Sequence, residues 1–243
     1  DTSTAYEQSA NITWQVNPKH KVKIYYTNSS TVQNVYLQGR TLVSFFVAPE
    51  AAIKSDVDTN TYQATWVMPA TSRLLFEAGY SHHPTGWSFD PVDRANLNAP
   101  GLIQVGPTMA LNNMSGWLGG ATSRSSPKQV DSFRFAGSYV TGSHSFKFGV
   151  TALRQWTGTV QEGNQTPPWT SAIFLAAFNS PISVNFYGTS EQQEWAVSTG
   201  LYAQDQWTLD RLTLNLGVRW DRASAGYPDE VRPANIYVPQ EFN

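Results

Sequence analysis

Two adjacent histidines, His82 and His83, are the residues of this chain most suited by type to binding a metal ion. They stand at the end of an alternating segment and are followed by Pro84. Successive side chains of a β-strand point to opposite faces, so neighbouring histidines cannot share one ion unless the backbone leaves the strand. The other histidines, His20 and His144, lie near short turns at the opposite end of the expected strands. We therefore predict no metal site and no bound cofactor.

Serine, histidine and aspartate all occur in this chain, but no recognisable motif arranges them for nucleophilic catalysis. The sequence contains neither a GxSxG nor an HExxH pattern. It also contains no glycine-rich loop of the kind that cradles phosphate. Asp56 and Asp58 fall in a segment expected to be a loop, where their spacing indicates no catalytic pair. We therefore predict no catalytic residues and a protein that is not an enzyme.

The composition favours β-structure and excludes several other classes of protein. Hydrophobic residues make up 40% of the chain and charged residues only 14%, with 9 Trp, 11 Tyr and 12 Phe, a bias typical of strands. The net charge of −2 gives no sign of a nucleic-acid partner. The absence of cysteine excludes a disulfide scaffold. No segment approaches the roughly 18 consecutive apolar residues of a transmembrane helix, and the mean hydropathy is −0.36.

Alternation of apolar and polar residues is the main structural signal. From residue 212 every second side chain is apolar up to residue 220, which predicts a strand with one apolar and one polar face. The same pattern predicts four hairpins, with strands at residues 12–16 and 22–26, 62–68 and 74–80, 133–139 and 146–152, and 201–209 and 212–220. Asp205 falls on an apolar face. A bulge, an interfacial position or a different phase are the alternatives for it.

Long segments rich in Gly, Pro, Asn and Ser, such as residues 82–101 and 157–170, separate the hairpins. Short turns at one end and long loops at the other are typical of an outer-membrane barrel with periplasmic turns and extracellular loops. Residues 182–188 also alternate and could form an extra hairpin above the membrane. The predicted fold is all-β: an antiparallel transmembrane β-barrel segment of about eight strands of roughly ten residues each. Both ends of the chain would lie in extracellular loops, which favours a piece of a larger barrel over a complete eight-stranded one.

The last hairpin, LYAQDQW (201–207) followed by LTLNLGVRWD (212–221), resembles a hairpin that recurs in TonB-dependent outer-membrane receptors. Three further stretches are similar to the Oar-like branch of these receptors, which often carry a carboxypeptidase-regulatory-like domain: HSFKFGV (144–150), NITWQVNPKHKVKIYYT (11–27) and RLLFEAGYS (73–81). The resemblance covers most of the chain through its strands.

This resemblance implies a barrel of about 22 strands in the bacterial outer membrane, with an N-terminal plug and a TonB-contacting segment. Neither is visible here, so residues 1–243 are expected to be part of one barrel domain, with the plug and N-terminal domain absent. The implied function is that of the barrel wall in TonB-energised uptake. The implied partners are outer-membrane lipid, the TonB complex through the missing N-terminal segment, and a small-molecule, sugar or peptide ligand.

Two sets of side chains are candidates for contact with a ligand or a plug. The first consists of charged residues on predicted polar faces, which would line the lumen: Arg73, Glu77, Arg134, Lys147 and Arg219. The alternative for this set is a solvated or mutually paired wall. The second consists of aromatic residues in the long segments, which could stack on a sugar or grip a peptide: Trp87, Trp117 and Trp169. The alternative for these is packing of the loops against one another.

Three other classes of protein fit part of the pattern. A secreted β-sandwich that binds a ligand would pack the apolar faces of its strands together. A small complete outer-membrane barrel would have a structural or adhesive role. An outer-membrane barrel enzyme would need a Ser/His/Asp set near one rim.

Overall fold

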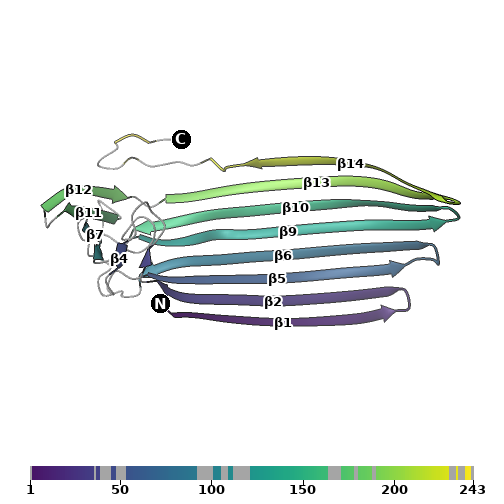
Figure 1. The fold of residues 1–243 in the computed structure, drawn as a ribbon, viewed down its shortest axis with the longest axis horizontal. Coiled ribbons are helices and arrows are strands. Elements are labelled where there is room, and N and C mark those ends of the chain that lie inside the picture. Colours follow the sequence, from purple (N-terminus) through teal and green to yellow (C-terminus); the bar gives the residue numbers. More distant parts are fainter. Residues whose placement is uncertain are drawn as a thin grey trace.

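The computed structural model describes residues 2–35, 37–38, 45–47, 53–91, 101–104, 109–111, 121–163, 171–177, 180–187, 190–229, 234 and 239–241. These residues form two β-sheets, a large one of eight long strands and a small one of six short strands (Figure 1). No helix in this described part of the chain is long and apolar enough to cross a membrane.

The large sheet contains four hairpins side by side, and every neighbouring pair of its strands is antiparallel. Its order is β1-β2-β5-β6-β9-β10-β13-β14. The strands are β1 (Thr2–Asn17), β2 (His20–Val35), β5 (Ile53–Pro69), β6 (Leu74–Pro91), β9 (Ala121–Thr141), β10 (His144–Gly163), β13 (Ser190–Leu209) and β14 (Leu212–Gly226). The four predicted hairpins are thus confirmed. Within the described residues β1 and β14 pair on one side only, so the sheet is open.

The strands are longer than the sequence pattern indicates, with 15 to 21 residues each instead of about ten. The extra length lies at the ends away from the hairpin turns. In β2, for example, alternation stops at Asn28, and the strand continues through a run of Ser and Thr. Alternation marks only strands whose two faces meet different surroundings. The extensions therefore carry no such signal, although their backbone pairing continues.

Short turns close the hairpins at one end of the sheet. Local hydrogen bonds and positive φ angles stabilise the tight reversal of the chain in these turns. The Oδ1 of Asn17 accepts hydrogen bonds from the backbone N–H groups of Lys19 (2.9 Å) and His20 (3.0 Å). Such Asx turns favour tight chain reversal. The third and fourth turns place Gly142 at φ 53° and Asp210 at φ 47°, a left-handed conformation that Gly adopts freely and Asp tolerates.

The turns step along the sheet from one hairpin to the next, as the right-hand end of Figure 1 shows. The third hairpin ends at Thr141, two residues beyond Tyr139, the partner of the first residue of β6 (141 − 139 = 2). The fourth ends at Leu209, two residues beyond Trp207, the partner of the first residue of β10 (209 − 207 = 2). Two residues rise about 6.6 Å, while two strand spacings cover about 9.6 Å. Bringing these turns to one height therefore requires a strand tilt of about 35°, the value typical of barrels.

The register gives the sheet two chemically different faces, because directly paired residues share a face and neighbours along a strand do not. We call one the polar face; it includes Lys21, Lys23, Tyr25, Gln63, Thr65, Glu77, Ser81, Arg134, Lys147, Thr151, Gln204, Asn215, Arg219 and Asp221. We call the other the apolar face; it includes Ile12, Trp14, Ile24, Trp66, Phe76, Phe135, Phe148, Leu201, Leu216, Val218 and Trp220. Side chains of the apolar face stay exposed, including Ile12 (66%), Trp220 (55%) and Val218 (74%). A sandwich would bury these side chains, so the structure does not support that alternative.

The small sheet is built from the three long connections between hairpins and lies at the end of the strands opposite the short turns (Figure 1). Its order is β12-β11-β7-β8-β4-β3. The strands are β3 (Leu37–Gln38), β4 (Phe45–Val47), β7 (Gly101–Gln104), β8 (Met109–Leu111), β11 (Ser171–Ala177) and β12 (Ser180–Tyr187). Pairing of β11 with β12 confirms the extra hairpin expected around residues 182–188.

A close approach on the polar face explains why Gly149 has no side chain. A Cβ at this position would lie 2.5 Å from both the carbonyl oxygen of Phe135 and the hydroxyl of Tyr202. We expect Gly149→Ala to lower the free energy of unfolding by about 1–3 kcal/mol, because backbone and ring must move. The matched control is Gly217→Ala on the same face, where the nearest atom is the Gln204 Cβ at 3.2 Å. A urea titration of the full-length protein in lipid would contradict the account if both variants unfolded at the same midpoint.

Candidate functional site

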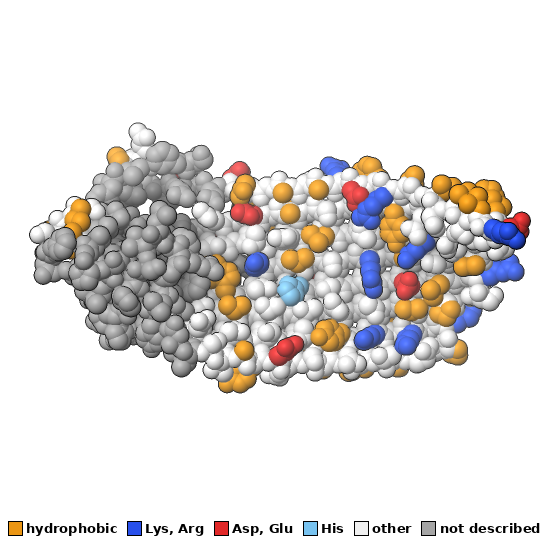
Figure 2. Space-filling view, in the orientation of Figure 1, with side chains coloured by type: hydrophobic (Ala, Val, Ile, Leu, Met, Phe, Trp, Pro, Cys, Tyr) orange, Lys and Arg blue, Asp and Glu red, His pale blue; other side chains and the backbone are white. Residues whose placement is uncertain are grey.

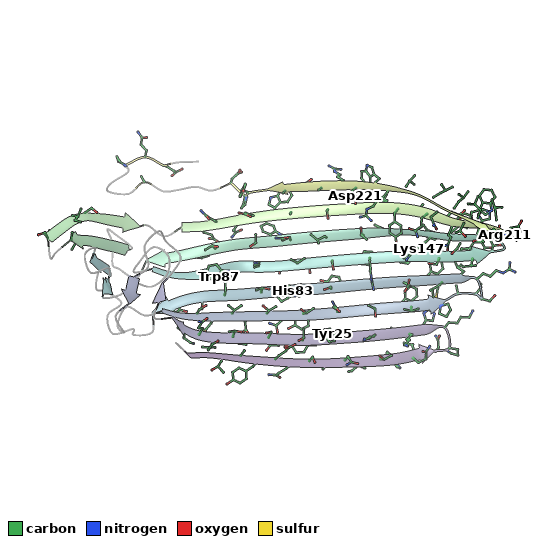
Figure 3. All side chains as sticks on the ribbon, viewed as in Figure 1. Tyr25, His83, Trp87, Lys147, Arg211 and Asp221 are labelled. Atoms are coloured by element: carbon green, nitrogen blue, oxygen red, sulfur yellow. The ribbon has the colours of Figure 1, made fainter. Side chains whose placement is uncertain are left out.

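The predicted lumen-lining residues fall partly on one surface. Glu77, Arg134, Lys147 and Arg219 share the polar face, which Figure 2 views, and Lys147 is labelled in Figure 3. Arg73 does not join them on a strand, because it lies in the turn between β5 and β6. There the hydroxyl oxygen of Thr71 accepts a hydrogen bond of 3.2 Å from the Arg73 backbone N–H.

Charges on the polar face differ in whether they have a partner. The guanidinium of Arg219 makes a two-pronged contact with Asp221, with Nη2–Oδ1 at 2.7 Å and Nε–Oδ2 at 2.8 Å. This two-bond contact satisfies the hydrogen bonding of the guanidinium and of the carboxylate, and it holds the Arg219 side chain along β14. Among the described residues, Glu77, Arg134 and Lys147 make no ion pair within 4 Å. These three side chains therefore remain available to another molecule.

Of the three predicted ligand-contacting tryptophans, the structure describes one. Trp87 lies in β6 opposite Val57 and is half-buried, so it belongs to a strand extension rather than to a loop. Figure 3 shows it near the end of the sheet from which the long connections leave. Trp117 and Trp169 lie outside the described residues.

The two adjacent histidines point to opposite faces, as strand geometry requires. His82 lies on the apolar face, where its Nδ1 lies 2.7 Å from the Asp131 carboxylate, and the Tyr80 hydroxyl donates to the same oxygen at 2.8 Å. His83 lies on the polar face, with its Nδ1 2.7 Å from the Thr61 hydroxyl. In the described part of the chain, no group of three or more His, Cys, Asp or Glu side chains is placed to hold a metal ion.

Asp205 keeps the phase that the sequence indicates and lies on the apolar face without a bulge. It pairs with Phe146 on one side and Leu216 on the other. The Nδ1 of His144 lies 2.6 Å from its Oδ2, and its Oδ1 is buried with no hydrogen-bond partner. The imidazole stacks on Trp207, with ring centroids 5.3 Å apart. This pair sits beside the third and fourth turns, which fits the interfacial alternative for Asp205.

Sequence reasoning did not identify the histidine partners of Asp131 and Asp205, although one signal was available. Both aspartates occupy apolar phases of their strands, and each has a histidine on the same face of a neighbouring strand, His82 and His144 respectively. A carboxylate facing an apolar environment needs a donor. Such a histidine is therefore the natural partner to look for.

Two bands of aromatic and polar rings border the apolar face. Near the turns, His20 stacks on Trp66 (5.7 Å between centroids). Towards the other end, Trp156 pairs with Trp195 between β10 and β13, and Arg154 lies over the Trp156 ring (5.7 Å). Such rings favour the interfaces of a membrane.

The separation of these bands fits the thickness of a bilayer. On β10, His144 of the turn-end band and Trp156 of the other band lie 12 residues apart (156 − 144 = 12). Twelve residues span about 40 Å along a strand. At a tilt of about 35° this becomes about 32 Å along the membrane normal, close to the roughly 30 Å of the hydrocarbon core.

An open antiparallel sheet with an exposed apolar face, two aromatic bands and a polar face on the other side defines a segment of a transmembrane β-barrel wall. The family described as "Outer membrane beta barrel domain" matches residues 1–241, so the chain belongs to this family and to the outer membrane. In that setting the apolar face meets lipid and the polar face meets the lumen.

A solved structure agrees with this fold. The outer membrane transporter YddB from Escherichia coli superposes with a TM-score of 0.58 at 13% identity, covering 90% of this chain and 27% of that one. BauA, the ferric preacinetobactin receptor from Acinetobacter baumannii, superposes with a TM-score of 0.47 at 12% identity, covering 95% of this chain and 35% of that one. No curated protein matches the sequence significantly. This chain thus spans about a third or less of the transporter and of the receptor.

Proposed function

We propose that these residues form part of the barrel wall of a TonB-dependent receptor of the Oar-like branch. In this proposal the wall itself is passive. Ligand binds to the extracellular segments and to a plug, and energy that arrives through a periplasmic contact rearranges the plug and opens a path. The polar face would then contact plug or substrate through residues such as Glu77, Arg134 and Lys147, and Trp87 would contribute to ligand contact.

The observation that carries this proposal is an open barrel wall, in which the first and last of the eight strands do not pair with each other. Within the described residues β1 and β14 have no partner on their outer sides, whereas outer-membrane barrels have no free edges. The superposition with the E. coli transporter covers 90% of this chain but only 27% of the transporter, which supports a larger barrel. The sequence of the hairpin formed by residues 201–207 and 212–221 supports the TonB-dependent class by resemblance, and residues 11–27, 73–81 and 144–150 support the Oar-like branch in the same way.

The proposal is tested on the gene product as the cell makes it. We expect the intact polypeptide, recovered from the outer-membrane fraction and sized by mass spectrometry, to be several times longer than these residues. We also expect formaldehyde cross-linking in living cells to join it to TonB. A product with no additional domain, or one that never cross-links to TonB under any growth condition in which it is made, contradicts the proposal.

A further inference from the structure

Two arginines lie on the apolar face, the side of the wall that meets lipid. Arg154 of β10 has the same phase in its strand as Phe148, and Arg222 of β14 has the same phase as Val218. Both arginine side chains are exposed. Charged side chains are rare on a lipid-facing surface, because hydrocarbon does not solvate them. Arginines at such positions therefore call for a partner, and their height in the membrane indicates which one.

Both arginines lie at one height, just inside the aromatic band away from the turns. Arg154 is ten residues from the turn end of β10 at His144 (154 − 144 = 10), and Arg222 is ten residues from that of β14 at Leu212 (222 − 212 = 10). At about 2.7 Å per residue along the membrane normal, both lie about 27 Å above the turns, and Trp156 lies about 32 Å above them. Their guanidinium groups can therefore extend to the level of the lipid headgroups. The guanidinium of Arg154 lies over the Trp156 ring, 5.7 Å from its centroid, and so extends towards this level.

β13 separates the two arginines and supplies a hydroxyl group between them. β10, β13 and β14 are neighbours in the large sheet (Figure 1). The register pairs Arg154 with Val197 and Arg222 with Thr199, on one face of β13. Two strand spacings and two residues place the Cα atoms of the arginines about 12 Å apart, so two long side chains can reach one group held between them. The Thr199 hydroxyl can donate a hydrogen bond to the same group.

Neither arginine takes part in an ion pair with any residue that the structure describes. Asp131 is opposite Arg154 in the register, but other groups engage its carboxylate. The Tyr80 hydroxyl donates to it at 2.8 Å, and Nδ1 of His82 lies 2.7 Å from the same oxygen. A guanidinium offers parallel N–H donors that match two oxygens of a phosphate. Two guanidinium groups favour a phosphomonoester, which carries close to two negative charges at pH 7, over a zwitterionic headgroup.

We infer that Arg154, Thr199 and Arg222 form a site on the lipid-facing wall for a lipid whose headgroup is a phosphomonoester, in the leaflet away from the turns. The site goes beyond the proposed function, because it requires the barrel wall and no transport step. The acyl chains of the bound lipid lie along the apolar face on the turn side of the site. There Leu201 pairs with Trp220, and these side chains are 49% and 55% exposed. This apolar contact favours a lipid over free phosphate.

Native mass spectrometry of the full-length protein tests the site by counting the lipids that it retains. The protein is reconstituted in phosphatidylcholine vesicles that contain phosphatidic acid, whose headgroup is a phosphomonoester. We expect Arg154→Gln with Arg222→Gln to retain at least about tenfold less phosphatidic acid than the wild-type protein, because charge-assisted hydrogen bonds are lost. The matched control is Arg134→Gln with Lys147→Gln, which removes the same charge from the polar face and should retain as much as wild type. Equal retention by the two double variants overturns the inference.

Two further arms show whether the arginines share one phosphate and where that phosphate comes from. We expect each of Arg154→Gln and Arg222→Gln alone to lower the retention of phosphatidic acid. A loss confined to one of them overturns the shared site. Millimolar inorganic phosphate should not displace the lipid, because it has no acyl chains to bury, and displacement would assign the site to free phosphate instead. If lipid retention behaves as expected but TonB cross-linking fails, the proposed function is lost and the lipid site stands.

Discussion

A Val218→Arg variant of the full-length protein is expected to lose about 2–4 kcal/mol of folding free energy in a lipid bilayer, the cost typical of arginine near the midplane on a lipid-facing strand. The Val218 side chain is 74% exposed on the apolar face of β14. It lies six residues from the strand start at Leu212 (218 − 212 = 6). At about 2.7 Å per residue along the membrane normal this is about 16 Å above the turn, inside an apolar band about 25 Å tall.

The matched control for Val218→Arg is Gln204→Arg. Gln204 pairs with Gly217, the chain neighbour of Val218, but points to the polar face. A guanidinium there stays in water, so we expect a change of less than about 0.5 kcal/mol. Guanidinium titrations of both variants in vesicles measure the difference. If both substitutions were equally tolerated, Val218 would not face lipid, and the apolar face would need another covering.

The arrangement of this sheet could be predicted from sequence wherever its two faces differ chemically. The alternation around Leu216 and Val218 indicated the correct strand, face and hairpin, because lipid on one side and water on the other constrain every second residue. The same reasoning failed for the strand extensions, such as the Ser-Thr run of β2. There both faces have similar surroundings, and backbone pairing alone holds the strand. The second sheet, formed by the three connections, could not be predicted either. Strands such as β3 have two residues, which is too short to show an alternating pattern.

Predicting the candidate site was harder, because it depends on contacts between strands. The shared face of Glu77, Arg134 and Lys147 follows from alternation once the hairpins are known. Arg219 is paired with Asp221, two residues further along its strand, whereas Arg134 is unpaired. This difference depends on side-chain geometry, which alternation does not indicate. Arg73 was expected on a polar strand face, but β6 begins one residue later, at Leu74, and Arg73 lies in the bend that connects β5 to β6. Strand ends are where local patterns constrain the chain least.

The His144–Asp205 pair stabilises a carboxylate on the lipid-facing side, and removing the histidine is expected to cost about 2–3 kcal/mol. In His144→Leu the Asp205 carboxylate would lose its donor at 2.6 Å while its other oxygen already lacks one. The side chains are 35% and 20% exposed, so water offsets part of the loss. We expect the unfolding midpoint of the full-length protein in lipid to fall accordingly.

The double variant His144→Leu with Asp205→Leu separates pairing from packing. Two leucines between Phe146 and Leu216 suit an apolar surface, so we expect the double variant to regain most of the stability that His144→Leu loses. Asp205→Leu alone leaves an imidazole stacked on Trp207 and should cost little. A double variant as unstable as His144→Leu would mean that the stacked ring, and not the His144–Asp205 contact, stabilises this corner of the sheet. In that case water, and not His144, would stabilise the Asp205 carboxylate at the interface.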